Sequence, residues 1–230
     1  MKILQRILAT AISIAAVLIL LISAFEIGAY SDYSWYERTY EKYAVLEKLD
    51  MKMEDVMHVT KEMMSYLRGN RKDLVVETIV NGREQEFFND REKAHMIDVK
   101  NLFMGGIWIR RILILIFLFV IFLLVKLKLE WKRILCKCLL IGFGLFLGLV
   151  AGIGGLVVSN FNKYFLLFHK VAFRNDLWLL NPETDFLIRM LPEGLFLDMV
   201  VRIGIILLIL MFISAVISIF ALCRLKNKNN

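Results

Sequence analysis

Residues 107–125 of the chain are IWIRRILILIFLFVIFLLV, and Arg110 and Arg111 are the only charged side chains in this run. A helix of about 20 mostly apolar residues crosses the roughly 30 Å hydrocarbon core of a bilayer. Three more segments have this character, and they are Ile7–Tyr30, Leu139–Val158 and Met199–Cys223. Hydrophobic residues make up 59% of the 230 residues, above the about 45–50% of soluble domains. The sequence therefore predicts a mainly α membrane protein with four transmembrane helices.

The basic residues indicate which side of the membrane each connection occupies. The N-terminus, the connection 126–138 and the C-terminal tail together hold ten of the 29 Lys and Arg residues and one of the 22 acidic residues, Glu130. The ten bases are Lys2, Arg6, Lys126, Lys128, Lys132, Arg133, Lys137, Arg224, Lys226 and Lys228. Lys and Arg are enriched in short cytoplasmic connections. Both termini are therefore predicted to be cytoplasmic, and the net charge of +7 reflects topology rather than a nucleic-acid partner.

The predicted organisation alternates membrane helices with loops, two of which form an extracellular α+β cap. The order is the N-terminus and first transmembrane helix 1–30, cap part 31–106, second helix 107–125, cytoplasmic loop 126–138, third helix 139–158, cap part 159–198, fourth helix 199–223 and cytoplasmic tail 224–230. The first apolar segment is longer than a signal-peptide core and has no clean cleavage site, so we interpret it as an uncleaved anchor in the cell membrane. None of the three cysteines lies in the predicted cap, so an external disulfide framework is excluded.

Residues 31–106 contain an aromatic segment, an amphipathic helix and a hairpin. Met53–Leu67 has apolar residues at helical spacing, and Leu74–Phe88 is interrupted by Asn81-Gly82, a strong hairpin signal. That turn would place Glu77 opposite Glu86, so we expect a cation near the pair. Tyr30–Tyr43 is rich in Tyr and Trp, which fits either an aromatic belt at the membrane interface or the wall of a lipid-binding site. The candidate substrate-binding residues in this segment are Tyr33, Trp35, Tyr36 and Tyr40.

A second helix is expected to begin at Asn89 or Asp90, because Asn89 and Glu92 have the spacing of a capping box. On this helix Glu92, His95 and Asp98 share one broad face. A carboxylate one turn away on either side can orient an imidazole and raise its basicity. A solvated charged face would have the same pattern, so both interpretations stay open.

The loop 159–198 contains a second candidate histidine. His169 lies within an apolar stripe at helical spacing that includes Phe165, Phe168 and Phe173. Burial disfavours the charged imidazolium, so a neutral imidazole able to accept a proton is expected, although an inert core histidine would also fit. Asn181-Pro182 is predicted to start another short helix.

Sequence signatures of common enzyme classes are absent. The chain has no HExxH, GxSxG, P-loop or Rossmann glycine pattern. The histidines are His58, His95 and His169, and His58 falls off the apolar face of its helix, where we expect it to be solvated. An enzyme with this sequence is predicted to use two histidines, no metal and no cofactor.

Two stretches resemble signatures of the lipoprotein intramolecular transacylase (Lit) family. Residues 87–103, FFNDREKAHMIDVKNLF, resemble the first signature. The second comprises Phe168-His169, FRNDLW at 173–178, Asn181-Pro182, Asp185, Leu187-Ile188 and LPE at 191–193. The four-helix layout with two outer loops also agrees, so the resemblance covers nearly the whole chain.

The resemblance implies an acyltransferase of the bacterial cell membrane that acts on diacylated lipoproteins within the lipid bilayer. The sn-2 acyl chain would move from the diacylglyceryl-cysteine to the cysteine α-amino group and give the lyso-form lipoprotein. His95 and His169 match the two catalytic histidines. Glu92, Asp98 and Lys100 belong to the first signature as supporting residues, and the second contains Asn175 and Trp178, which are candidate oxyanion donors. Phe168 and Phe173 would help to form an aromatic chamber from which water is excluded.

The chemistry of the residues agrees with this activity. Aminolysis of an ester requires a neutral amine and an acid for the departing oxygen, and two imidazoles suit both steps. Two other functions remain: an accessory protein that binds a lipidated partner without catalysis, and a metal-dependent membrane hydrolase. The accessory function predicts binding that survives loss of both histidines, and the hydrolase predicts sensitivity to a chelator.

Overall fold

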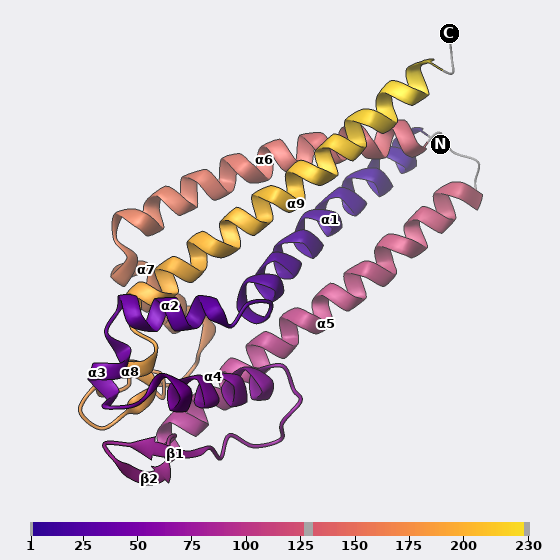
Figure 1. Ribbon diagram of the computed structural model, residues 1–230. Helices are drawn as coiled ribbons and strands as arrows, with labels where there is room; N and C mark the ends of the chain where they lie inside the picture. The colour runs from indigo at the N-terminus through magenta and orange to yellow at the C-terminus, as the bar shows by residue number, and fades with distance from the viewer. Residues whose placement is uncertain (1, 127–130, 228–230) are drawn as a thin grey trace. The chain divides into compact units, whose positions relative to one another are not determined.

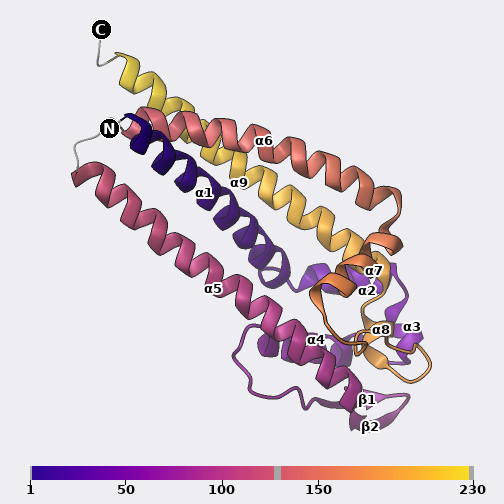
Figure 2. The same ribbon diagram turned by 180° about the vertical axis from the view of Figure 1, so that it is seen from behind.

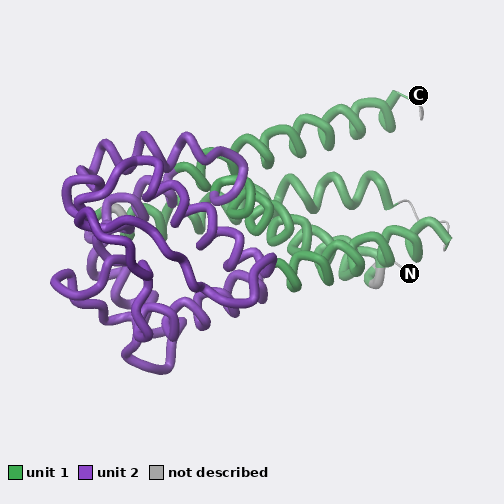
Figure 3. Tube along the Cα trace, turned by 60° about the horizontal axis from the view of Figure 1, so that its bottom comes forward, with its two compact units in different colours: residues 1–28, 107–159, 202–230 green, residues 29–106, 160–201 purple. Residues whose placement is uncertain are grey.

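The computed structural model describes residues 2–126 and 131–227. Lys128, Glu130 and Lys228, which belong to the predicted charge distribution, lie outside these residues. So does part of the predicted cytoplasmic connection 126–138. The described chain forms two compact units, which Figure 3 colours separately. We call residues 1–28, 107–159 and 202–230 the membrane unit, and residues 29–106 and 160–201 the globular unit.

Four helices of the described chain are long and apolar enough to cross a membrane, as the sequence predicts. They are α1 (Lys2–Tyr30), α5 (Asp90–Lys126), α6 (Trp131–Ser159) and α9 (Glu193–Asn227). The first turns of α5, up to Gly106, belong to the globular unit, and the helix continues into the membrane unit from Ile107. The first turns of α9 likewise belong to the globular unit, up to Val201. The helices are thus longer than the apolar segments that predict them.

Within the membrane unit, α1, α6 and α9 lie side by side (Figures 1 and 2) and share a small apolar core. Its buried residues are Val17, Ala24, Phe143, Leu207 and Met211. Glu26 of α1 forms an ion pair with Arg110 of α5. Pairing is the usual condition for charged side chains within membrane helices.

The globular unit packs several short elements around one apolar core. The elements that contribute residues to this core include α2 (Ser34–Lys42), α3 (Val45–Leu49), α4 (Met53–Leu67), β1 (Glu77–Val80) and α8 (Phe186–Met190). The exposed strand β2 (Arg83–Glu86) pairs with β1, and α7 (Phe161–Ala172) contributes no residue to the core. The bounds of α4 coincide with the predicted amphipathic helix, and eight of its 15 residues are buried. The helix stops at Gly69, whose φ of 83° is a left-handed conformation that favours glycine.

The hairpin forms with the predicted register. Glu77 is opposite Glu86, and Thr78 is opposite Gln85. Asn81 and Gly82 both have positive φ, 52° and 70°, as a type I′ turn requires. The cation expected near the glutamates is Lys93 of α5, which forms an ion pair with Glu86.

The segment between α7 and α9 differs from the prediction at one point. Asn181-Pro182 does not start a helix; residues 182–184 form a turn, and α8 begins at Phe186. The Asp185 carboxylate accepts a hydrogen bond from the Asn181 N–H at 2.7 Å, and the Asp185 N–H donates to the Asn181 carbonyl at 2.8 Å. These two bonds close the turn and delay the helix by one turn.

Candidate active site

His95 lies on the second turn of α5, after the capping box that the sequence predicts. The Asn89 N–H donates to a Glu92 carboxylate oxygen at 2.8 Å, and the Glu92 N–H donates to the Asn89 side-chain oxygen at 3.0 Å. This reciprocal arrangement fixes the start of the helix. The box therefore determines where the His95 backbone lies.

Glu92 also connects α5 to the second loop of the globular unit. Its side chain is fully buried, and its other oxygen accepts a hydrogen bond from the Leu187 N–H at 2.6 Å. The Asn89 amide donates to Asp185 at 2.8 Å. Burial raises the pKa of Glu92, against the lowering effect of the hydrogen bonds from Leu187 and Asn89. Burial alone would raise the pKa of Asp185 as well, but hydrogen bonds from Asn181, Asn89 and Thr184 and the Arg91 charge outweigh it and lower that pKa.

The His95 imidazole is buried without a hydrogen-bond partner on one side. The residue is 6% exposed, and no described residue of the chain is bonded to its Nδ1 atom. Burial, and then the positive charge that His169 can carry, lower the pKa of His95 to about 4, while the Asp98 charge acts in the opposite direction. His95 is therefore neutral near neutral pH. A buried polar atom without a partner requires an explanation, and a substrate atom is one.

His169 lies on α7 and is held by its own helix. Its Nδ1 atom is 2.8 Å from the Phe165 carbonyl oxygen. A carbonyl can only accept, so we assign the proton to Nδ1, which leaves the lone pair of the neutral ring on Nε2. The sequence led us to expect burial of His169, but His169 is only partly buried, and His95 is the buried histidine of the pair.

The two imidazoles lie together among aromatic rings. Their ring centroids are 6.3 Å apart. The Phe173 ring is 5.1 Å from His95 and 5.6 Å from His169. Phe165, Trp178 and Phe168 surround His169 at 4.3, 5.2 and 5.4 Å. The structure therefore brings together both predicted histidines and three of the predicted aromatic or supporting residues, Phe168, Phe173 and Trp178.

A cavity of about 600 Å³ shares the Phe173 and Trp178 walls of this cluster. Its lining is completed by Leu166, Lys170, Arg174, Asn175, Asp176 and Leu179. Two aromatic rings, two basic side chains and the Asp176 carboxylate therefore line the same cavity. It lies wholly within the globular unit.

Two predicted supporting residues, Asp98 and Lys100, form hydrogen bonds to loop residues and not to a histidine. Asp98 accepts a hydrogen bond from the Asn175 side-chain amide at 2.8 Å, so the Asn175 donor is engaged and Asp98 acts on His95 only through its charge. Lys100 donates to the Arg71 carbonyl at 2.7 Å and lies 3.9 Å from the centroid of the Tyr66 ring. It stabilises the connection after α4. Glu92, as described above, bonds to Asn89 and Leu187.

The aromatic segment around α2 divides into core residues and residues packed on the core. Tyr36 and Tyr40 are buried, and their hydroxyl groups bond to the Ala29 carbonyl at 2.9 Å and to Thr60 at 2.7 Å. Tyr33 and Trp35 are partly buried against the same core. Tyr36 and Tyr40 therefore stabilise the globular unit rather than line the histidine cluster.

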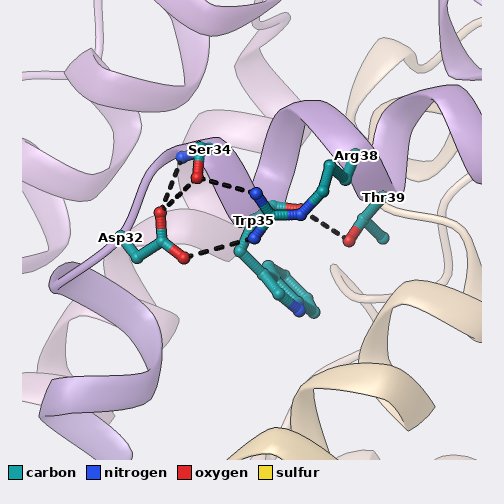
Figure 4. Close-up of polar contacts among 5 residues, drawn as sticks. All are labelled: Asp32, Ser34, Trp35, Arg38 and Thr39. Atoms are coloured by element: carbon teal, nitrogen blue, oxygen red, sulfur yellow. Dashed lines mark hydrogen bonds and ion pairs between the residues drawn. The ribbon is translucent and has the colours of Figure 1, made fainter.

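Polar side chains fix the start of α2 (Figure 4). Asp32 accepts hydrogen bonds from the Ser34 N–H at 3.1 Å and from its hydroxyl at 2.6 Å. Arg38 donates to the Ser34 hydroxyl at 2.9 Å, and the Thr39 hydroxyl donates to the Trp35 carbonyl at 2.7 Å. These contacts are local, so they order α2 without contributing to the site.

The second family signature contains Asp185 and Leu187, and the apolar stripe around His169 contains Phe165, but sequence reasoning assigned none of the three a role in the site. Asp185 and the Leu187 N–H act across more than 90 residues of sequence, which no local pattern reveals. Phe165 acts through its backbone carbonyl. Its position four residues before His169 is the one signal that points to this bond, since i and i+4 residues meet on a helix.

The helices and the histidine cluster define a class: a multi-pass membrane protein with a histidine pair, one member buried and one partly buried, in a globular unit. A family model described as lipoprotein intramolecular transacylase Lit matches residues 10–196. The chain therefore belongs to the Lit family and is a lipoprotein intramolecular transacylase. Its substrate is a lipoprotein.

Solved structures support the fold. The chain is similar to the membrane integral lipoprotein intramolecular transacylase Lit from Bacillus cereus, with 21% sequence identity, a TM-score of 0.76 and coverage of 98% of this chain and 99% of that chain. Two single-substitution variants of that protein match at TM-scores of 0.74 and 0.75, each with 20% identity. They cover 98% and 99% of this chain and 96% of their own chains. Among curated proteins no similar sequence is found.

Proposed function

We propose that this transacylase moves the sn-2 acyl chain of a diacylglyceryl-cysteine to the cysteine α-amino group, with His95 and His169 as its catalytic residues and no cofactor. The observation that carries the proposal is the pair of imidazoles, 6.3 Å apart between ring centroids, within one aromatic cluster. An intramolecular transfer brings its own acyl donor, so orientation of amine and ester supplies much of the rate.

His169 is the general base. Its Nδ1–H donates to the Phe165 carbonyl, so the Nε2 lone pair is available for the α-amine proton, and the same carbonyl stabilises the imidazolium that forms. His95 is a poor proton acceptor because its pKa is lowered to about 4. The base role therefore falls to His169.

The proton accounting follows from this assignment. The amine nitrogen attacks the sn-2 carbonyl carbon, and His169 takes the proton that the nitrogen loses. When the bond between the carbonyl carbon and the glycerol oxygen breaks, His169 returns that proton to the glycerol oxygen. The neutral His95 donates its N–H to the oxyanion of the tetrahedral intermediate.

The aromatic rings protect the intermediate from hydrolysis. Phe173 is buried and contacts both imidazoles, and Trp178 covers His169. The Trp178 indole N–H is a second candidate donor to the oxyanion. The Asn175 amide, which is bonded to Asp98, is less suited to that role. Exclusion of water favours the amine over hydroxide as the nucleophile.

The charge distribution supports a cytoplasmic location for both termini and an extracellular location for the globular unit. An impermeant thiol reagent tests this in intact cells. Cysteines introduced at the exposed Glu54 and Glu183 should react, whereas native Cys223, which is exposed and lies at the predicted cytoplasmic end of α9, should not. The reverse labelling would contradict the orientation.

The reaction itself is tested by mass spectrometry of a diacylated lipopeptide treated with the purified protein. An intramolecular acyl shift adds and removes no atoms, so the mass should stay constant while the α-amine becomes blocked. One base-labile chain should become base-resistant, and EDTA should have no effect. His169→Ala is the inactive control and His58→Ala the active one.

Three results would contradict the proposal. Loss of one fatty acid would indicate hydrolysis, and gain of one acyl chain would indicate transfer from a phospholipid. An unchanged peptide that still binds would indicate an accessory protein.

A further inference from the structure

Helix α7, which carries His169, has no buried residue along its 12 positions. One face does contact other parts of the globular unit. The ring centroids of Phe165 and Phe196 are 5.1 Å apart, and those of His169 and Trp178 are 5.2 Å apart. A second face is apolar and uncovered. Leu167, Phe168 and Val171 are 50%, 50% and 78% exposed. The three lie at helical spacing, so their side chains adjoin one another on one face of α7.

The third face of α7 is basic. Lys163 and Lys170 are exposed and lie seven residues apart, on the same side of the helix. Arg174 follows one turn later, and no acidic residue occurs between residues 160 and 175. A helix with an uncovered apolar face beside a face of lysines is typical of segments that lie in the membrane interface.

Chain continuity places the start of α7 at the membrane. The spanning helix α6 ends at Ser159 and α7 begins at Phe161, so Asn160 alone separates them. The Asn160 side chain caps α7 by accepting from the Lys163 N–H at 3.2 Å. Consecutive Cα atoms are about 3.8 Å apart, so α7 starts within several ångströms of the end of a membrane helix.

We propose that α7 lies in the lipid–water interface, with Leu167, Phe168 and Val171 in the hydrocarbon of the bilayer and Lys163 and Lys170 among lipid phosphates. The occupant of the uncovered face is thus the lipid bilayer itself. Anionic headgroups complement the acid-free basic face.

This placement gives the acyl chains a route to the histidines, a step that rests on the function proposed above. The Phe168 ring is half-exposed and lies 5.4 Å from the His169 ring. The chains of a bilayer-anchored lipoprotein reach His169 along the apolar face of α7 without entering water. The face is therefore a lateral access route as well as a membrane contact.

Membrane depth tests the placement without any use of activity. Native Cys136, Cys138 and Cys223 are replaced by serine, and a spin label is attached at Leu167→Cys or Val171→Cys in vesicles of phosphatidylcholine and phosphatidylglycerol. Lys170→Cys reports the basic face, and Glu84→Cys, on exposed β2, is the aqueous control. Collisions with apolar oxygen and with a water-soluble nickel complex are measured by electron paramagnetic resonance.

Labels at residues 167 and 171 should collide with oxygen at least about fivefold more, relative to nickel, than the labels at residues 84 and 170. Equal ratios at all four positions would overturn the proposal. Protection of residues 167 and 171 from both reagents would also overturn it, because a second copy or another protein would then cover the face.

Turnover tests the access route separately. Leu167→Gln with Val171→Gln should lower turnover of a lipopeptide in bilayers about tenfold. Ile79→Gln, which alters an equally exposed apolar residue of β1, should leave turnover unchanged. If the labels lie in lipid but the double variant turns over normally, the access route is wrong. If the wild type has no transacylase activity, the proposed function fails while the depth result stands.

Discussion

The two helices that carry the histidines are held in opposite ways. The first turns of α5 are fixed by buried groups: Glu92 has no exposure, His95 is 6% exposed, and the capping box joins Glu92 to Asn89. Helix α7 buries no residue, and His169 is oriented by one bond to its own helix. The protein thus fixes one imidazole in its interior and leaves the other partly exposed.

This difference suits the two histidines to different chemical roles. A buried neutral ring with a free nitrogen is suited to donate a hydrogen bond to a charge that develops in the transition state. A partly exposed ring with a fixed tautomer is suited to exchange protons with a substrate amine. Variants that alter α5 and not α7, or α7 and not α5, test this assignment.

The largest expected effect is the loss of either imidazole. His95→Ala and His169→Ala should each lower the transacylation rate by about 10²–10⁴-fold, the usual contribution of a general acid–base group. The rates are measured by mass spectrometry of a lipopeptide, with the amount of protein in the membrane as a check. His58→Ala is the matched control, since His58 is exposed on α4. Turnover close to the wild-type rate by His169→Ala would remove that residue from the mechanism.

Glu92 should stabilise the contact between the first turns of α5 and the segment around Leu187. Glu92→Ala leaves the N–H groups of Asn89 and Leu187 without their acceptor, and losing hydrogen bonds to a charged group costs about 3 kcal/mol. Thermal unfolding in detergent should show a clear drop in Tm. Glu92→Gln keeps one acceptor oxygen and should lose about half as much. If both variants unfold at the wild-type temperature, the network does not hold the globular unit together.

Acid should lower the folding stability of the protein through protonation of His95. The folded-state pKa is about 4 and the unfolded value is about 6.5, so between these values the unfolded chain binds the extra proton. Stability therefore rises with pH across this window and is lost as the pH falls from 6.5 to 4, by up to about 3 kcal/mol. His95→Leu removes this contribution, and its Tm should fall less than that of the wild type between pH 7 and pH 4.5. Parallel Tm curves would show that His95 titrates normally.

Local patterns predicted local structure well. The four apolar segments, the bounds of α4, the hairpin register and the Asn89–Glu92 box were all confirmed, because each depends on residues at most a few turns apart. The prediction that a helix starts at Asn181-Pro182 was wrong, because the Asp185 carboxylate accepts from the Asn181 N–H and closes a turn there. Helix-start signals in the sequence do not reveal such a side-chain bond.

The partners of the acidic residues were not predictable from one sequence. Glu92 and Asp98 share a helix face with His95, which suggested that they orient it, but their hydrogen bonds come from Leu187 and Asn175, 95 and 77 residues away. Tertiary contacts of this kind decide which member of a polar face touches a substrate. The family signatures indicated the two segments that form the site. The structure distinguishes the candidate catalytic histidines in them from residues such as Glu92 and Asp98, whose hydrogen bonds stabilise the fold.

The smallest expected effect concerns the bond that connects α5 to the loop after α7. Asp98 accepts from the Asn175 amide at 2.8 Å, and that loop also carries Trp178, which covers His169. Asp98→Ala removes the acceptor, and loss of an exposed hydrogen bond of about 1 kcal/mol corresponds to about fivefold in rate. Asp98→Asn keeps an acceptor oxygen and should lower the rate about twofold, as initial rates on the same lipopeptide will show. An Asn variant as slow as the Ala variant would mean that the charge of Asp98 near His95, and not its hydrogen bond to Asn175, sets the rate. A normal rate for both variants would mean that the loop after α7 is held without α5.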